Sequence, residues 1–452
     1  MTVSVRVGRG QLLRRAGTVS VLFMAFLALS RLIGFGREAV IAYLFGAART
    51  TDEYVAAVAL PELAAGILLS GLLGFAIIPA FMRLQTAGRA DKANRLLGAA
   101  LGQVLVWSSA IALVGIFFAP LLISIVAPGL VGAARTDAAT MLRIMSPSIV
   151  FFGLGSLGAA ILNTRRSFLP VPLALIAANA SSIAVLVILS HFVGIRAAAI
   201  AYLLAAAIGG VLQWLIASRR VPHLRINFRS RDPEVRVVLV SGAIAMVVTG
   251  APYFRYLVER SMASTQSAGD LASLGFASRL VLFLAAVIAV PLGTIAFPSM
   301  AEHVARKDGA ALQRLIRRSA GLALAVCVPA TLALVLFAPA VVQLVFERGA
   351  FGRASTLLTA SILSLYVLGL IPLAINEILV RALLAMEQKA AVLFILVGGL
   401  SVSIAVNLIL LGSWGVRGLA VGASAGVWLS CILMIGMLGR VSRPATESSA
   451  SH

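Results

Sequence analysis

Charged residues are scarce in this chain of 452 residues. Only 12% are Asp, Glu, Lys or Arg, whereas soluble domains carry about 25%. Hydrophobic residues make up 61% of the sequence, and the mean hydropathy is +1.04. This composition lies far outside the range of soluble domains and predicts a protein that is embedded in a lipid bilayer.

Cysteine and histidine are also rare, which excludes several kinds of chemistry. The two cysteines, Cys327 and Cys431, lie in separate apolar runs, so the chain offers neither a disulfide framework nor a thiolate metal cluster. The four histidines are scattered, no glycine loop is followed by Lys and Ser or Thr, and no pair of carboxylates has a base beside it. We therefore expect neither an enzyme nor an ATP-driven pump, and no metal or organic cofactor.

The few charges are mostly of one sign, since Lys and Arg outnumber Asp and Glu and give a net charge of +21. In a soluble protein this excess would suggest a nucleic-acid partner. Here the basic residues lie in short segments between apolar runs, which is how membrane proteins set their orientation. We therefore expect no nucleic-acid partner.

Several apolar stretches are long enough to cross about 30 Å of hydrocarbon, which takes roughly 20 helical residues. The first follows the basic segment 6–15 and is too long for a cleaved signal peptide. The sequence predicts twelve stretches, at 19–46, 53–82, 96–127, 136–162, 168–193, 197–217, 237–262, 268–300, 319–346, 355–386, 390–413 and 417–439.

The connections between these stretches alternate in charge. One set is strongly basic and includes 83–95, 219–236 and 306–318, and both termini share this character. The other set carries mostly single arginines, such as Arg49 and Arg196. Because cytoplasmic loops hold the excess of Lys and Arg, we predict a multi-pass protein of the bacterial inner membrane with both termini in the cytoplasm.

Two stretches of the chain align without a gap at an offset of 219 residues. The landmarks Pro79, Arg95 and Phe118-Ala119-Pro120 recur as Pro298, Arg314 and Phe337-Ala338-Pro339. Because the offset spans an even number of helices, both copies enter the membrane in the same direction. We predict an all-α membrane protein with about 12 transmembrane helices in two parallel-repeat six-helix lobes around a central cavity. The lobes are 1–217 and 237–440, with a basic cytoplasmic linker at 218–236 and a disordered tail at 441–452.

Charged residues within the apolar stretches mark the predicted cavity, because an ionisable side chain in hydrocarbon is costly. Arg31, Arg37 and Arg279 indicate an anionic, phosphate-bearing ligand, since a guanidinium group stays charged and binds phosphate oxygens through two hydrogen bonds. Gly34 and Gly36 are expected to break or bend the first helix so that Arg31 and Arg37 face one cavity. The alternative is internal pairing of these arginines with Glu38, Asp52 or Glu62.

Four further charges are candidates for ion coupling or for the cavity wall, namely Glu38, Glu62, Arg255 and Glu259. The spacing of four residues between Arg255 and Glu259 suits an ion pair within one helix, and mutual neutralisation explains this pair as well as ligand contact does. Arg260 is expected to lie near a helix end and to reach the lipid headgroups. Na⁺ and H⁺ are the candidate coupling ions.

Several segments resemble the MurJ (MviN) lipid II flippases of the multidrug/oligosaccharidyl-lipid/polysaccharide exporter superfamily. They are SRLIGFGRE at 30–38, FGA at 45–47, TDEY at 51–54, GAAILNT at 158–164, ASRL at 277–280 and LGTI at 292–295. The resemblance implies a cavity open alternately to each side, in which Arg31, Arg37 and Arg279 hold the headgroup of an undecaprenyl-linked glycan lipid. Asp52 matches an acidic position of that cavity. Membrane lipids and cell-wall synthesis proteins are the other partners that the resemblance implies.

Two features depart from this family. Ala64-Ala65-Gly66 stands where the family usually carries an Arg pair, and Ser70 stands at a following acidic position. The sequence also ends after its twelfth stretch, whereas typical members have two more helices that line a groove for the prenyl tail. These differences predict a different polyprenyl-linked glycan, a partner that supplies the missing surface, or the same transport with fewer charged groups.

Three functions remain open at this point. The leading hypothesis is a flippase that moves lipid II or a related polyprenyl-diphosphate-linked sugar for peptidoglycan or polysaccharide synthesis, by alternating access. The first alternative is an ion-coupled exporter of small cationic compounds on the same fold, in which Asp52, Glu62 and Glu259 would act; a positively charged cavity disfavours it. The second alternative is a non-transporting membrane scaffold.

Overall fold

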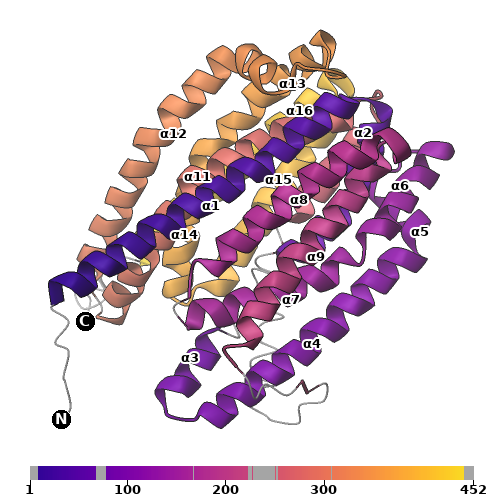
Figure 1. Ribbon diagram of the computed structural model, residues 1–452. Coiled ribbons are helices and arrows are strands. Elements are labelled where there is room, and N and C mark those ends of the chain that lie inside the picture. Colours follow the sequence, from indigo (N-terminus) through magenta and orange to yellow (C-terminus); the bar gives the residue numbers. More distant parts are fainter. Residues whose placement is uncertain are drawn as a thin grey trace, which may run out of the picture. The chain divides into compact units, whose positions relative to one another are not determined.

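The computed structural model describes residues 9–67, 78–165, 167–221, 226–227, 250, 253–306 and 308–441, and the regular structure within them is helical (Figure 1). The first nine helices are α1 (Arg9–Phe45), α2 (Arg49–Ile67), α3 (Ile78–Thr86), α4 (Ala90–Phe117), α5 (Ala119–Val126), α6 (Ala133–Met145), α7 (Ser148–Thr164), α8 (Pro170–Val193) and α9 (Arg196–Ser218). After a helical segment at 253–264 come α11 (Asp270–Ala305), α12 (Gly309–Phe346), α13 (Arg353–Tyr366), α14 (Leu370–Ala385), α15 (Lys389–Trp414) and α16 (Val416–Val441).

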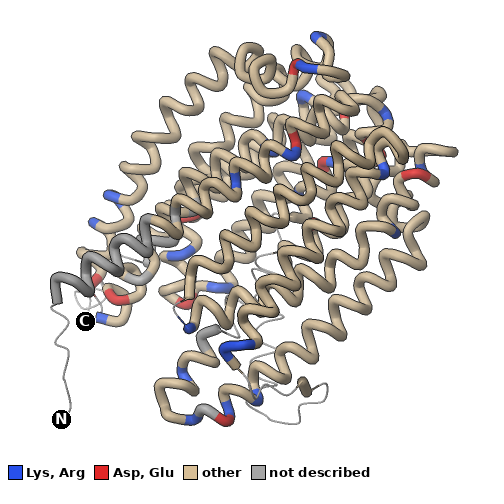
Figure 2. Tube along the Cα trace, viewed as in Figure 1, with Lys and Arg blue, Asp and Glu red and all other residues tan. Residues whose placement is uncertain are grey.

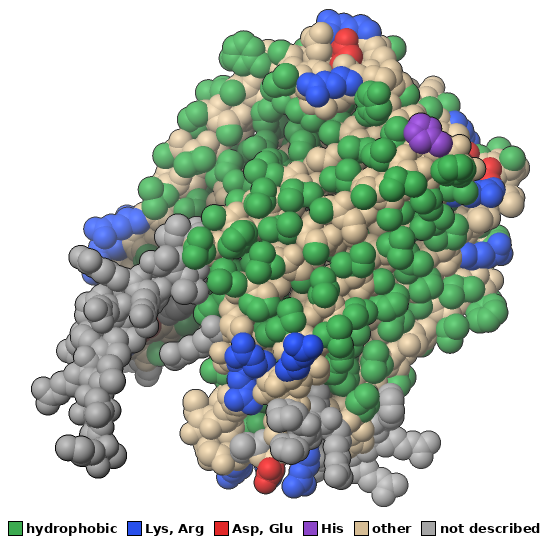
Figure 3. Space-filling view, in the orientation of Figure 1, with side chains coloured by type: hydrophobic (Ala, Val, Ile, Leu, Met, Phe, Trp, Pro, Cys, Tyr) green, Lys and Arg blue, Asp and Glu red, His purple; other side chains and the backbone are tan. Residues whose placement is uncertain are grey.

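Within the described residues, nine helices are long and apolar enough to cross a membrane. They correspond to nine of the twelve predicted stretches. Of the other three, 53–82 and 237–262 lie partly outside the described residues, and 19–46 falls almost entirely within α1. Lys, Arg, Asp and Glu lie mostly toward helix ends (Figure 2), and hydrophobic side chains are spread over the visible surface between them (Figure 3). This distribution is the one that a bilayer requires.

The two halves of the sequence repeat unusual backbone conformations at matching places. Phe118 ends α4 with φ −102° and ψ 17°, and Phe337 interrupts α12 with φ −110° and ψ 18°. A proline follows two residues later in both cases and cannot donate a helical hydrogen bond. Gly194 after α8 and Gly415 after α15 also agree closely, with φ 57° and ψ −139° against φ 55° and ψ −138°. The same local backbone conformations therefore recur at these two pairs of positions, whereas the parallel repeat of two six-helix lobes stays a prediction.

The chain divides into two compact units. Unit 1 comprises 1–40, 64–119 and 141–246, and unit 2 comprises 41–63, 120–140 and 247–452. Unit 2 therefore combines two short pieces of the first half of the sequence with residues 247–452. The predicted division into lobes at 218–236 stays a prediction, because most of that linker, like the tail from 442, lies outside the described residues.

Close helix packing in unit 1 depends on small residues. Helix α9 packs against both α7 and α8 (Figure 1). A Cβ atom on Gly210 of α9 would lie 2.3 Å from the backbone oxygen of Phe151 in α7, and one on Gly158 would lie 2.9 Å from the backbone of Gln213. Glycine at such positions lets two membrane helices approach closely enough for extensive van der Waals contact.

Replacing Gly210 with Ala is expected to destabilise unit 1 by about 1–3 kcal/mol, because the two helix backbones must separate to admit the methyl group. Gly321→Ala is the matched control, since a Cβ atom there would meet nothing within 4 Å. That change is expected to be neutral or to stabilise by up to about 1 kcal/mol, as alanine favours the helix. Unfolding in mixed micelles measures the change in stability for both variants. Equal losses in Gly210→Ala and Gly321→Ala would contradict the packing argument.

Candidate functional site

The first group of predicted site residues lies on α1. Arg31 is exposed, and the described part of the chain shows no ion-pair partner for it. The Nη2 atom of Arg37 lies 2.9 Å from Oε1 of the adjacent Glu38, and its guanidinium carbon lies 5.9 Å from the ring centre of Tyr202 in α9. The internal pairing that the sequence left open is thus present for Arg37, whose side chain is mostly buried.

Helix α1 continues through Gly34 and Gly36 without a break. Asn179 of α8 explains the need for a small residue here, because a Cβ atom on Gly34 would lie 3.2 Å from its amide nitrogen. That amide also donates a 3.2 Å hydrogen bond to the backbone oxygen of Ser30. Gly34 therefore allows α8 to approach α1 between the two arginines, and the expected break in the helix is not found.

The second group, which we call the Glu62 cluster, consists of Glu62, Arg260 and Arg279. Glu62 lies on α2 directly after Pro61, a proline inside the helix. Its Oε2 atom lies 2.8 Å from Nη2 of Arg260, and its Oε1 atom lies 3.2 Å from Nη2 of Arg279 on α11. Two guanidinium groups thus contact one carboxylate.

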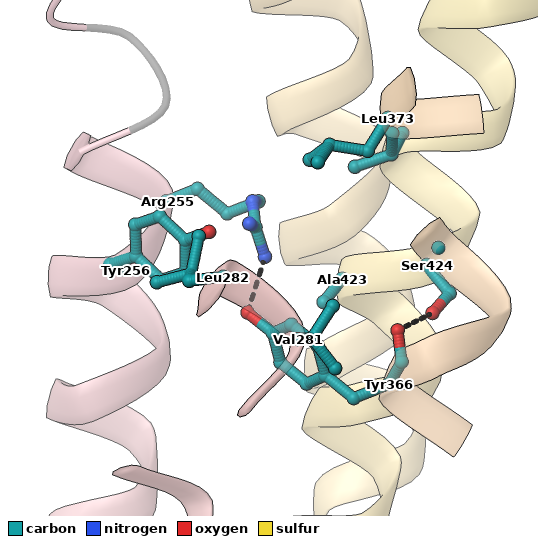
Figure 4. A pocket seen from close by; sticks show the side chains of 10 residues that line it. Arg255, Tyr256, Val281, Leu282, Tyr366, Leu373, Ala423 and Ser424 are labelled. Atoms are coloured by element: carbon teal, nitrogen blue, oxygen red, sulfur yellow. Dashed lines mark hydrogen bonds between the residues drawn. The ribbon is translucent and has the colours of Figure 1, made fainter. Parts of the chain in front are cut away.

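The third group, which we call the Arg255 cluster, lies in unit 2 and consists of Arg255, Tyr256, Glu259 and Tyr366, of which all but Tyr256 are buried. Arg255 forms an ion pair with Glu259 one helical turn away, which confirms the pairing predicted from their spacing. Arg255 also donates a 2.9 Å hydrogen bond to the hydroxyl of Tyr366 on α13 (Figure 4). That hydroxyl in turn donates a 3.0 Å bond to Glu259. The Tyr256 ring centre lies 4.3 Å from the guanidinium carbon. Each charge of this cluster is therefore neutralised within the protein.

Asp52 stands at the beginning of α2 and caps a helix that begins 218 positions later in the chain. Its Oδ2 and Oδ1 atoms accept 2.7 Å hydrogen bonds from the backbone N–H groups of Gly269 and Ala272, at the first turn of α11. A carboxylate at this place satisfies N–H groups that have no partner within the helix and also meets the positive end of the helix dipole. Asp52 is 1% exposed, so its carboxylate is fully occupied by the protein.

Further contacts join the same segments of unit 2. Arg49 donates a 2.8 Å hydrogen bond to the backbone oxygen of Gly129, whose N–H donates a 3.1 Å bond to the hydroxyl of Ser264. The N–H of Ala350 donates a 2.9 Å bond to the backbone oxygen of Tyr43. Together with the Asp52 cap, these contacts form what we call the closed end of unit 2. It ties 41–63 and 120–140 to the second half of the chain, at connections that carry few basic residues.

Burial raises the pKa of the Asp52 carboxyl from its usual 3.8 to about 6, although the N–H groups of Gly269 and Ala272 and the charge of Arg49 lower it. The folded protein therefore binds this proton more tightly than the unfolded chain does. The resulting stabilisation is complete below pH 3.8 and is lost as the pH rises through the folded pKa. We expect the free energy of unfolding to fall by up to about 3 kcal/mol over this window because of Asp52.

Asp52→Asn removes the titrating carboxyl group, so the free energy of unfolding of the variant should depend less on pH than that of the natural chain. Unfolding in mixed micelles between about pH 4 and pH 7, compared between the natural chain and the variant, measures this difference. Asp91→Asn is the matched control, because Asp91 is an exposed acid in the first turn of α4. A difference between the natural chain and Asp52→Asn that does not change with pH would contradict the prediction.

Sequence reasoning found the charged members of these groups but not all their partners. The expectation that Arg260 reaches lipid headgroups is wrong, because its guanidinium group binds Glu62 and its side chain is 14% exposed. Tyr202, Tyr366 and Asn179 were not predicted as members of any site. Their contacts join residues far apart in the sequence, and no local pattern marks such partners.

The whole chain was compared with known families and proteins. The model of the family described as "Lipid II flippase MurJ" matches residues 41–448. The lipid II flippase MurJ of Burkholderia cenocepacia is 30% identical over 420 residues, which cover 90% of this chain and 81% of that protein. The probable lipid II flippase MurJ of Rickettsia prowazekii is 26% identical, with 93% and 82% covered.

Solved structures show the same fold. A lipid II flippase MurJ in an inward closed conformation superposes with a TM-score of 0.79 at 21% identity, covering 93% of this chain and 87% of that one. An inward-facing multidrug MATE transporter gives a TM-score of 0.78 at 17% identity, with 94% and 100% covered. From the family match, the similarity in sequence and the shared fold, we conclude that this chain is a multi-pass membrane protein and a transporter rather than an enzyme, and that it belongs to the lipid II flippase MurJ family.

Proposed function

We propose that the chain moves a polyprenyl-diphosphate-linked sugar, lipid II or a related cell-envelope precursor, across the bacterial inner membrane by alternating access. The observation that carries this proposal is the Glu62 cluster, in which two arginines share one carboxylate within a bundle of apolar helices. Ionisable groups in such a place are costly and mark substrate pathways. Both termini are proposed to lie in the cytoplasm, on the evidence of the basic connections.

The electrostatic balance favours an anionic substrate. In the Glu62 cluster two guanidinium groups contact one carboxylate, and Arg31 is exposed without an acidic partner among the described residues. Guanidinium groups bind phosphate oxygens in pairs of hydrogen bonds, so we assign Arg31, Arg37 and Arg279 to the diphosphate of the substrate. An exporter of cationic compounds would need an excess of accessible carboxylates. Instead, Asp52 and Glu259 are occupied by partners within the protein.

Asp52 is assigned a different role from the ligand contact that the sequence suggested. Its carboxylate holds the first turn of α11 and is almost completely buried. We propose that it stabilises the closed end of unit 2 and that the cap must open for a substrate to pass. Ion coupling is not needed for this role, and the driving force is left to the membrane potential or to the gradients of substrate, Na⁺ or H⁺.

A vesicle assay tests the proposed function. The purified chain is reconstituted into liposomes, and the transfer of fluorescent lipid II between leaflets is compared with that of another polyprenyl-diphosphate sugar and of a small cationic dye. We expect transfer of at least one diphosphate-linked sugar above that of empty vesicles, and no transport of the dye. Transport of the dye alone would support an exporter, and the absence of any transport would support a scaffold.

A further inference from the structure

The Glu62 cluster differs from the Arg255 cluster in how far its carboxylate is shielded. The side chain of Glu62 is 32% exposed, whereas those of Arg260 and Arg279 are 14% and 13% exposed. In the Arg255 cluster the carboxylate of Glu259 is 2% exposed and also receives the hydroxyl of Tyr366. The acid is therefore the accessible member of the Glu62 cluster, and its two arginines are held more deeply in the protein.

The three side chains of the Glu62 cluster come from different elements. Glu62 belongs to α2, Arg260 to the helical segment 253–264 and Arg279 to α11. Each carboxylate oxygen of Glu62 faces one guanidinium group, Oε2 toward Arg260 and Oε1 toward Arg279. A phosphate group presents the same edge of two oxygens to arginine. The carboxylate thus occupies the donors that a phosphate bound between these two arginines would use.

The charge of an anion determines how well it competes with Glu62 for the N–H donors of the two arginines. A diphosphate carries more negative charge than a carboxylate, so it attracts the two guanidinium groups more strongly than Glu62 does. Displacing Glu62 does not require a closed core to open, because 32% of its side chain is already exposed.

We propose that Glu62 is an internal stand-in for the phosphate of the substrate, and that Arg260 binds that phosphate together with Arg279 once Glu62 is displaced. This inference rests on the proposed function, because it concerns the same ligand. It adds Arg260 as a binding residue and gives Glu62 the role of a competitor. The competition makes the site selective, since a weakly charged anion does not displace the carboxylate whereas a diphosphate does.

Binding of inorganic pyrophosphate to the purified full chain in detergent micelles tests the inference, with isothermal titration calorimetry as the readout. Glu62→Gln removes the competing charge and should tighten binding by about tenfold, because a charge-assisted contact is freed. Arg260→Gln should weaken binding by about tenfold or more for the converse reason. Glu302→Gln is the matched control, since Glu302 pairs with Arg306 at the exposed end of α11, and it should leave the affinity within about twofold.

Unchanged pyrophosphate affinity in Glu62→Gln, or weaker binding, would overturn the role of Glu62, and unchanged affinity in Arg260→Gln would overturn that of Arg260. Glu62→Met provides a second uncharged variant if the glutamine variant does not fold. The vesicle assay separates this inference from the proposed function. If the chain transfers lipid-linked sugar but its affinity for pyrophosphate does not change in the Glu62 and Arg260 variants, only the present inference is rejected. If the affinities for pyrophosphate change as expected but no lipid-linked sugar is transferred, only the proposed function as a flippase is rejected.

Discussion

Replacing Arg255 with Met is expected to destabilise unit 2 by about 3–5 kcal/mol, because the change leaves a buried carboxylate without its counter-ion. Glu259 is 2% exposed and has Arg255 as its ion-pair partner on the same helix. The hydroxyl of Tyr366 would still donate one hydrogen bond to it, but a neutral donor does not balance a full charge. Unfolding in mixed micelles measures the loss.

Two further variants test whether the unpaired charge of Glu259 causes the loss of stability in Arg255→Met. Changing Arg255 and Glu259 together to Met removes both charges and should restore most of the lost stability, since apolar replacement of a buried pair is often nearly neutral. Arg306→Met breaks an ion pair of the same spacing that is 70% and 57% exposed, and it should cost at most about 0.5 kcal/mol. A double variant no more stable than Arg255→Met, or an Arg306→Met effect of equal size, would show that the charge is not the cause.

Replacing Arg279 with Ala is expected to slow the transfer of a polyprenyl-diphosphate sugar by roughly 100-fold while the protein remains in the membrane. The change removes a charge-assisted contact to phosphate, which is worth about 2–3 kcal/mol. It also leaves Glu62 with Arg260 as its only partner in the cluster, so the remaining arginine is held more firmly by the competitor. Arg31→Ala and Arg37→Ala are expected to reduce transfer in the same direction.

The control for these arginines is Arg306→Ala, an exposed position at the end of α11 whose change should alter transfer by less than about twofold. Arg279→Lys separates charge from geometry, because lysine keeps the charge but lacks the planar fork, and it should recover only part of the rate. Normal transfer in all three alanine variants, Arg31, Arg37 and Arg279, would show that these arginines do not hold the phosphates.

Features that depend on neighbouring residues were predictable from the sequence. Hydropathy located nine spans that the structure describes as long apolar helices. The offset between Pro79 and Pro298 predicted a repeat, and Phe118 and Phe337, which the same offset relates, have similar backbone angles. The period of the α-helix likewise predicted the pair of Arg255 and Glu259. Each depends only on composition or on spacing along a helix, which the bilayer and the backbone geometry impose on any chain.

Partners from distant segments were decided by the tertiary structure alone. Asp52 was predicted as a site residue from the resemblance alone, and its cap on α11 was not predicted, because helix packing brings that helix end to its carboxylate. Arg260 was expected to reach headgroups but meets Glu62, which stands 198 residues earlier in the chain. The sequence by itself thus determined that the chain is a bundle of membrane helices with arginines within its apolar stretches. Which acid each arginine meets follows from how the helices pack, and no periodicity along one helix encodes that packing.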